Sequence, residues 1–174
     1  MKLHVSHKMN FSSLKEYFYK LYNACLLRLL FPMGVFLLIY YLSLSGIISP
    51  YIQEEWIVDF LRYTYLALIL ITLTIVHLVV YKRLKHHAEV VGLGKKLDLY
   101  YLVVQARMKT ILVVSLFLAA GFLITGHEWF SIYFGGMMGW FLLQWPTPQR
   151  VSRQLKLRGD ERTMIVTKGE AFKF

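Results

Sequence analysis

Two uninterrupted apolar runs decide the fold: LALILITLTIV at residues 66–76 and ILVVSLFLAAGFLI at residues 111–124. Neither run alternates apolar and polar residues, as a membrane-spanning strand does over about 10 residues. A helix that crosses the hydrocarbon core of a bilayer, which is about 30 Å thick, needs about 20 mostly apolar residues. The two runs, extended outward to that length, therefore predict two membrane-spanning helices.

The same criterion, applied to the whole chain, predicts four spans, at residues 29–49, 56–81, 110–126 and 129–145. At 1.5 Å per residue the second span reaches about 39 Å and the fourth about 26 Å. We therefore expect the second to tilt or protrude, and the fourth to stand nearly upright or to lie where the bilayer thins. Because residues 97–106 are also largely apolar, the third helix is expected to begin before its span.

The composition agrees with a membrane protein. The chain has 174 residues, of which 57% are hydrophobic and 17% charged, and its formal net charge is +10. A soluble domain is about 45–50% apolar and about 25% charged, and a disordered nucleic-acid-binding tail is poor in apolar and aromatic residues. Both classes are excluded. One cysteine also excludes an internal disulfide and a four-cysteine metal site.

The basic residues are distributed unevenly between the two sides of the predicted spans. Segments 1–28, 82–109 and 146–174 hold 19 of the 20 Lys and Arg residues. Since cytoplasmic loops carry the excess of Lys and Arg, both termini are expected inside. The prediction is a single all-α domain over residues 1–174, an integral membrane four-helix bundle in a bacterial cytoplasmic (inner) membrane.

The basic residues behind the +10 charge are interpreted as setting the orientation of the chain in the membrane and as binding lipid head groups. Basic flanks bind anionic lipid head groups, and each basic residue near the surface contributes about 1 kcal/mol. The basic residues lie in three short membrane-anchored segments, so no nucleic-acid partner is expected. The residues expected to contact head groups are Lys82, Arg83, Lys85, Arg150, Arg153, Lys156 and Arg158.

Both ends of the chain carry signals for structure outside the spans. Ser13 and Glu16 fit a helix capping box, and residues 11–24 predict an amphipathic interfacial helix that lies on lipid or docks a partner subunit. In the short basic cytoplasmic tail, Thr147 is expected to cap a helix that Gly159 ends. Residues 163–168 have strand character and would fray or pair with a partner's edge strand.

Three ionisable residues fall inside a predicted span, where such residues are costly and mark candidate functional sites. Asp59 and Arg62 are three residues apart and therefore lie on one helix face. They are expected to form either a structural ion pair or a polar entrance for an ion or substrate. His77 is expected near the inner surface, bonded to a neighbouring helix or serving as a proton relay or haem ligand. A bis-histidine haem would need His77 from each of two chains, so no cofactor is predicted.

Two further groups have weaker signals. Two short outer loops contain a possible acidic cluster, formed by Glu54, Glu55, His127 and Glu128. These residues are expected to be either solvated loop tips or an acidic site for a cation. The cytoplasmic histidines match no closed metal site, so no metal is predicted. Gly135, Gly136 and Gly139 provide a small-residue face for close helix packing, with the third span or with another subunit as partner.

These observations predict a non-catalytic accessory or scaffold subunit of an inner-membrane assembly, docking partners and anionic lipid. The partners expected are other membrane subunits or further copies of this chain. One alternative is a small oligomeric channel or transporter that uses Asp59, Arg62 and His77. A second alternative is a membrane-embedded enzyme or redox anchor that uses His77. No catalytic residues are assigned.

Overall fold

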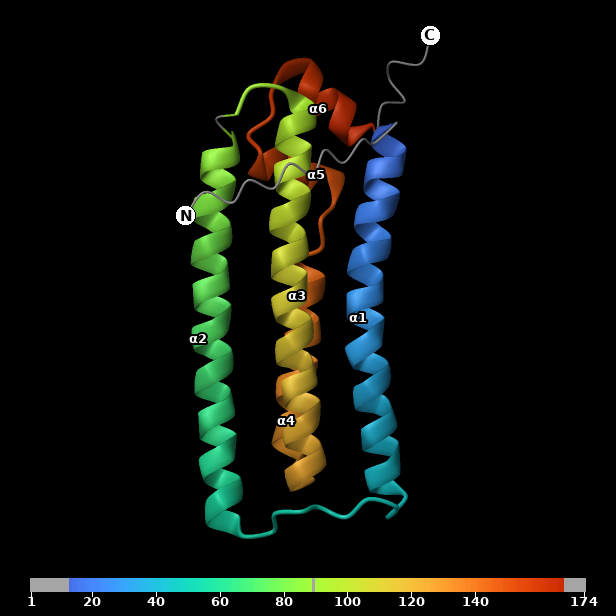
Figure 1. Cartoon of the computed structure of the whole chain (residues 1–174), viewed down its shortest axis with the longest axis vertical. Helices are drawn as coiled ribbons and strands as arrows, with labels where there is room; N and C mark the ends of the chain where they lie inside the picture. Colours follow the sequence, from blue (N-terminus) through green and yellow to red (C-terminus); the bar gives the residue numbers. More distant parts are fainter. Residues whose placement is uncertain (1–12, 89, 168–174) are drawn as a thin grey trace. The chain divides into compact units, whose positions relative to one another are not determined.

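The computed structural model describes residues 13–88 and 90–167. The outer ends of the predicted segments 1–28 and 146–174 lie outside the described residues. Within the described ranges every regular element is an α-helix (Figure 1), which confirms the all-α prediction. In chain order the helices are α1 (Leu14–Leu44), α2 (Glu55–Ala88), α3 (Leu93–Thr125), α4 (Glu128–Leu143), α5 (Pro148–Gln154) and α6 (Gly159–Val166).

Three helices, α1, α2 and α3, are long and apolar enough to cross a membrane. They contain the second predicted span completely and most of the first and the third. The helix at the fourth predicted span, α4, has 16 residues, which correspond to about 24 Å at 1.5 Å per residue. The third helix begins at Leu93, ahead of its predicted span, as the apolar stretch before that span led us to expect.

The first predicted span was too long, because α1 ends at Leu44 and residues 45–49 leave the helix. Gly46 has a φ of 69° there. Its N–H donates to the Ser43 carbonyl, and the N–H of Ile47 donates to the Leu42 carbonyl. These two bonds form a Schellman motif, which satisfies the last carbonyls of a helix and favours glycine at the left-handed position.

The segment after α1 is held at the end of α3. The Ile124 carbonyl accepts from the N–H groups of Tyr51 and Ile52, at 2.8 and 3.0 Å. Gly126, with a φ of 63°, lies so near Pro50 that a Cβ atom would approach the proline Cγ to 2.6 Å. The last turn of α3 is therefore closed by the connection that leads into α2.

The described chain divides into two compact units. The first contains residues 13–23, 81–88, 90–104 and 146–167, and the second residues 24–80 and 105–145. In the first unit the side chains of Tyr17, Phe18 and Leu21 are buried. The Tyr17 hydroxyl donates to the Leu97 carbonyl at 3.1 Å, and the rings of Tyr17 and Tyr101 lie 6.3 Å apart.

This burial changes the interpretation of the predicted amphipathic segment. The cap is present, since the Glu16 N–H donates to Ser13 Oγ at 3.1 Å. The segment is the beginning of α1, and part of its apolar face packs on the start of α3 within the same unit. The chain itself therefore covers part of the face that was expected to lie on lipid or to dock a partner subunit.

The second part of the first unit is a pair of short helices, α5 and α6, which pack against each other. Thr147 caps α5, as predicted, by accepting from the Arg150 N–H at 3.3 Å. The predicted stop at Gly159 was wrong, because Lys156 ends the helix with a φ of 52° and Gly159 opens α6.

The predicted strand at 163–168 was also wrong, because its described residues belong to α6 and the turn after it. Asp160 and Glu161 stand in the first turn of α6, where acidic side chains favour a helix. Glu161 also forms an ion pair with Lys96 on α3, at 3.0 Å, and Ile165 is fully buried. Tertiary contacts therefore override the β-propensity of this short segment.

The second unit is held together by aromatic side chains from α1 to α4. Phe36 on α1 stacks on Phe134 of α4 with ring centroids 4.0 Å apart, and it lies 5.5 Å from Phe122 on α3. Tyr65 on α2 contacts Phe130 of α4 edge to face at 5.0 Å. Each of α1, α2 and α3 thus has at least one ring contact with another helix of this unit.

Candidate functional site

The most buried cation of the second unit is Arg107, a residue of α3 that is only 6% exposed. Its Nη1 donates to the side-chain oxygen of Gln144 at 3.0 Å, and its Nη2 donates to the Gln144 backbone carbonyl at 2.9 Å. Two parallel bonds to one residue fix both the position and the plane of the guanidinium. Arg107 remains protonated at any physiological pH, so this part of the unit carries a permanent positive charge.

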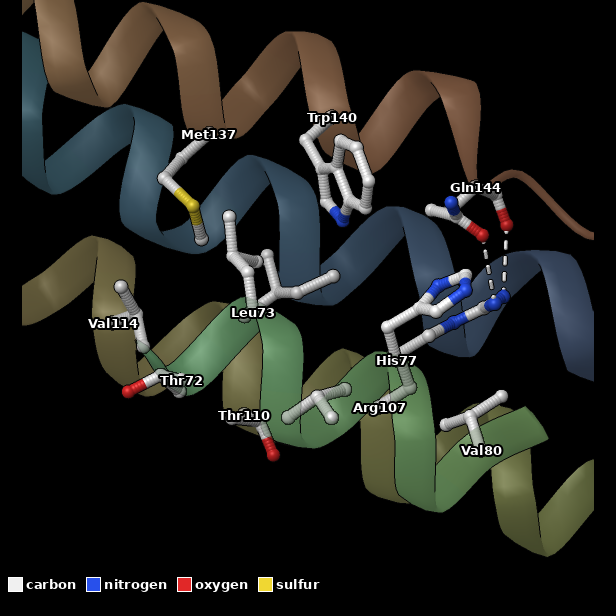
Figure 2. Close-up of a pocket in the computed structure, with 12 residues that line it drawn as sticks. Thr72, Leu73, His77, Val80, Arg107, Thr110, Val114, Met137, Trp140 and Gln144 are labelled. Atoms are coloured by element: carbon white, nitrogen blue, oxygen red, sulfur yellow. Dashed lines mark hydrogen bonds between the residues drawn. The ribbon is translucent and has the colours of Figure 1, made fainter. Parts of the chain in front are cut away.

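Arg107 and Gln144 line one end of a pocket between α2, α3 and α4, which we call the Arg107 pocket (Figure 2). His77 on α2 lies at the same end, and the indole nitrogen of Trp140 on α4 faces α2 and α3. The enclosed space is about 20 Å³, which suits one water-sized group. The full lining is Thr72, Leu73, Val76, His77, Val80, Arg107, Thr110, Ile111, Val114, Met137, Trp140 and Gln144.

Arg107, Gln144 and His77 form the polar end of this pocket. Each lies about 24 to 33 Å along its own helix from the end of that helix that is farther from the pocket. Arg107 is about 27 Å from the end of α3 at Thr125, and Gln144 is about 24 Å from the start of α4, at 1.5 Å per residue. His77 is about 33 Å from the start of α2 at Glu55. These distances of about 24 to 33 Å are close to the thickness of a hydrocarbon core, which is about 30 Å.

Sequence reasoning found only one member of this group. His77 was identified by its position inside a span, whereas Arg107 was counted among the topology-setting cations of segment 82–109. Gln144 was missed because an uncharged residue at the end of a span carries no signal. The early start of α3 was the available sign, since it places Arg107 well inside a helix of 33 residues.

The predicted bond from His77 to a neighbouring helix is not formed, because within the described residues its exposed side chain makes no hydrogen bond. Its position on the pocket lining, beside Arg107 and Gln144, places it in a donor-rich group. A neutral imidazole carries one N–H donor, and the protonated form carries two.

Asp59 and Arg62 form an ion pair of 3.5 Å on α2, with side chains that are 59% and 24% exposed. The guanidinium of Arg62 also lies over the ring of Trp129 on α4, 4.3 Å from its centroid. His77 is 15 residues further along α2, about 22 Å away at 1.5 Å per residue. The three intramembrane ionisable residues of the sequence prediction therefore belong to two separate places in the unit.

The residues of the predicted outer acidic group take separate positions at helix starts. Glu54 accepts from the Trp56 indole N–H at 3.1 Å, and His127 caps α4 by accepting from the Trp129 N–H at 3.4 Å. Glu55 and Glu128 stand in the first turns of α2 and α4, where negative charge favours the helix. Within residues 13–88 and 90–167, no three His, Cys, Asp or Glu side chains form a group that could hold a metal ion.

Within the described residues, the predicted glycine face does not pack against another helix. A Cβ atom added at Gly135, Gly136 or Gly139 would meet nothing within 4 Å. The close approach occurs at Gly121 on α3, where an added Cβ would lie 2.5 Å from the ring of Phe130. In the part of the chain that the structure describes, the third span is therefore not the partner of the three α4 glycines.

The first unit carries a second candidate site, a groove of about 690 Å³ on α5 and α6, which we call the basic groove. Four exposed cations line it, and no acidic residue stands among the described lining residues. Arg162 was absent from the predicted head-group contacts, because the basic helix was predicted to stop at Gly159. The lining is Gln149, Ser152, Arg153, Lys156, Leu157, Arg158, Arg162 and Val166.

The other predicted head-group residues also lie in described parts of the chain. Lys82, Arg83 and Lys85 are exposed on the last turns of α2, and Arg150 is half-buried on α5. The combination of three long apolar helices with a cation-rich unit is typical of a membrane protein. Compared with known protein families, curated proteins and solved structures, the chain shows no match.

Proposed function

We propose that this chain is a non-catalytic accessory or scaffold subunit of an assembly in a bacterial inner membrane. The observation that supports this proposal is the basic groove. Its lining offers four positive charges. No histidine, cysteine or carboxylate stands among the described lining residues to act as a base or activated nucleophile. Such a surface binds anionic groups, and within the first unit it stands on the helices that follow the last predicted span.

In this proposal the chain crosses the membrane four times, with α4 as the fourth span and both termini in the cytoplasm. The length of α4, about 24 Å, suits a nearly upright helix or a locally thin bilayer. The excess of Lys and Arg in the segments of the first unit supports the orientation. A reporter fused after Phe174 is expected to be cytoplasmic, and a periplasmic signal would overturn the orientation.

The role as a docking subunit is tested by purifying the full chain from its host in mild detergent. We expect membrane subunits and anionic lipid to co-purify with the unaltered chain. The double variant R153Q/R162Q removes two charges from the basic groove and is expected to reduce that recovery at least fivefold. The matched control, K95Q/K109Q, removes two exposed charges that lie outside the groove and is expected to retain it.

Two results would replace this proposal by one of its alternatives. A homo-oligomer whose liposome ion flux falls in the Asp59→Asn variant would identify a channel or carrier. A Soret absorption band that disappears in His77→Ala would identify a redox anchor. Equal recovery of partners and lipid from R153Q/R162Q and the unaltered chain would show that the basic groove does not dock them.

A further inference from the structure

The Arg107 pocket has the chemistry of an anion site inside the apolar unit. Arg107 is nearly fully buried, and its charge is held in place by two bonds to Gln144. The imidazole of His77 and the indole N–H of Trp140 add further donors to the lining. The polar end is therefore rich in donors.

The remainder of the pocket is apolar. Leu73 on α2, Val114 on α3 and Met137 on α4 continue from the polar end towards the middle of the unit (Figure 2). Val76 and Ile111 also line the pocket. A ligand that matches both parts has one anionic oxygen group and an apolar chain. The enclosed space suits a single oxygen-sized group, so the apolar chain would lie along the helix surfaces outside it.

We propose that the Arg107 pocket receives one phosphate oxygen of an anionic phospholipid, with one acyl chain along the helix surfaces beside the apolar part of the pocket. The distances along α2, α3 and α4 place Arg107, His77 and Gln144 near the boundary of a 30 Å hydrocarbon core, where lipid phosphates begin. Basic pockets between membrane helices bind anionic head groups elsewhere. This site lies in the second unit, so the inference does not rest on the basic groove.

Trp140 provides the readout, because it lines the pocket. In a full-length chain with Trp56, Trp129 and Trp145 changed to phenylalanine, its fluorescence is measured in liposomes that contain brominated phosphatidylglycerol or brominated phosphatidylcholine. We expect the anionic lipid to quench with about fivefold higher relative affinity, which corresponds to about 1 kcal/mol for one basic residue. Native mass spectrometry of the unaltered chain should retain phosphatidylglycerol with the same preference.

Three variants locate the preference. Arg107→Gln is expected to bring the ratio of the two lipid affinities close to one, and His77→Ala to lower it about twofold. His77 is exposed, so its variant keeps the folded structure even if the change at buried Arg107 disturbs it. Lys109→Gln is the matched control, because it removes an exposed charge two residues further along α3 that does not line the pocket.

Several results would overturn the inference. Equal quenching by the two lipids in the parent chain would show that no anion site exists near Trp140. An equal loss in Lys109→Gln and Arg107→Gln would assign the preference to general surface charge. Displacement by millimolar inorganic phosphate would identify a site for soluble anions. A loss in R153Q/R162Q would assign the preference to the basic groove, so the inference would fail while the proposed function stood.

Discussion

Replacing Gly121 with alanine tests how the helices of the second unit pack. The added Cβ would lie 2.5 and 2.7 Å from two ring carbons of Phe130 and 2.9 Å from the ring of Tyr65. Ordinary carbon contacts begin near 3.5 Å, so both rings must move by up to about 1 Å. Phe130 is fully buried and packs edge to face on Tyr65, which leaves it little room to move.

The expected cost follows from two opposing effects. Overpacking a tight site costs about 1–3 kcal/mol, and two rings meet the new methyl group, so we use the upper half of that range. Replacing glycine with alanine within a helix stabilises the helix by about 1 kcal/mol, which offsets part of this cost. We therefore expect Gly121→Ala to lower the free energy of unfolding by about 1–2 kcal/mol, or the melting temperature by several degrees.

The α4 glycines provide the matched control. Gly135→Ala and Gly139→Ala add the same methyl group to open space, so the isolated chain should be unchanged or more stable by up to about 1 kcal/mol. Thermal unfolding in one detergent compares the three variants. The double variant Gly121→Ala with Phe130→Leu should recover part of the loss, with a coupling energy of about 1 kcal/mol. A Gly121→Ala chain as stable as its parent, alongside a destabilised Gly139→Ala chain, would refute this packing.

Three further predictions concern the first unit. Lys156→Gly relieves a left-handed residue with a φ of 52° and should raise stability by about 1 kcal/mol, seen as a higher melting temperature; a lower one would contradict the helix stop at this residue. Tyr17→Phe removes the buried hydroxyl bond to the Leu97 carbonyl, which stays within helix α3, and should cost about 1 kcal/mol, whereas the same change at Tyr19, which is 67% exposed, should cost nothing measurable. Thr147→Ala removes the cap of α5 and should cost about 1 kcal/mol. Hydrogen exchange should then be faster in α5, and unchanged protection would argue against the cap.

Much of the helix pattern follows from local sequence. Long apolar runs without alternation predicted helices, and their lengths identified α1, α2 and α3 as able to cross a membrane. The caps at Ser13 and Thr147 were also predictable, because each depends on a side chain bonding a backbone N–H within three residues. Interactions of this range are encoded by a few adjacent residues, so one sequence suffices to find them.

The errors arose where a segment's structure depends on distant contacts. Residues 163–166 have strand-forming side chains, yet the ion pair from Lys96 to Glu161 and the burial of Ile165 place them in a helix. The glycines of α4 looked like the packing face, whereas Gly121 makes the close contact within this chain. A small residue shows in the sequence where a helix can be approached, but the neighbouring side chains determine which such position is used.

The candidate site shows the same division. Hydropathy and charge along the chain predicted a basic, helical membrane protein and singled out His77 as an unusual residue within a span. The grouping of His77 with Arg107 and Gln144 required three helices to pack together, since the first two residues are 30 positions apart in the sequence and Gln144 is 37 further on. The cost of burying a guanidinium depends on its surroundings in three dimensions. Arg107, which the sequence presents as a topology-setting cation, therefore becomes part of a pocket only through the packing of the helices.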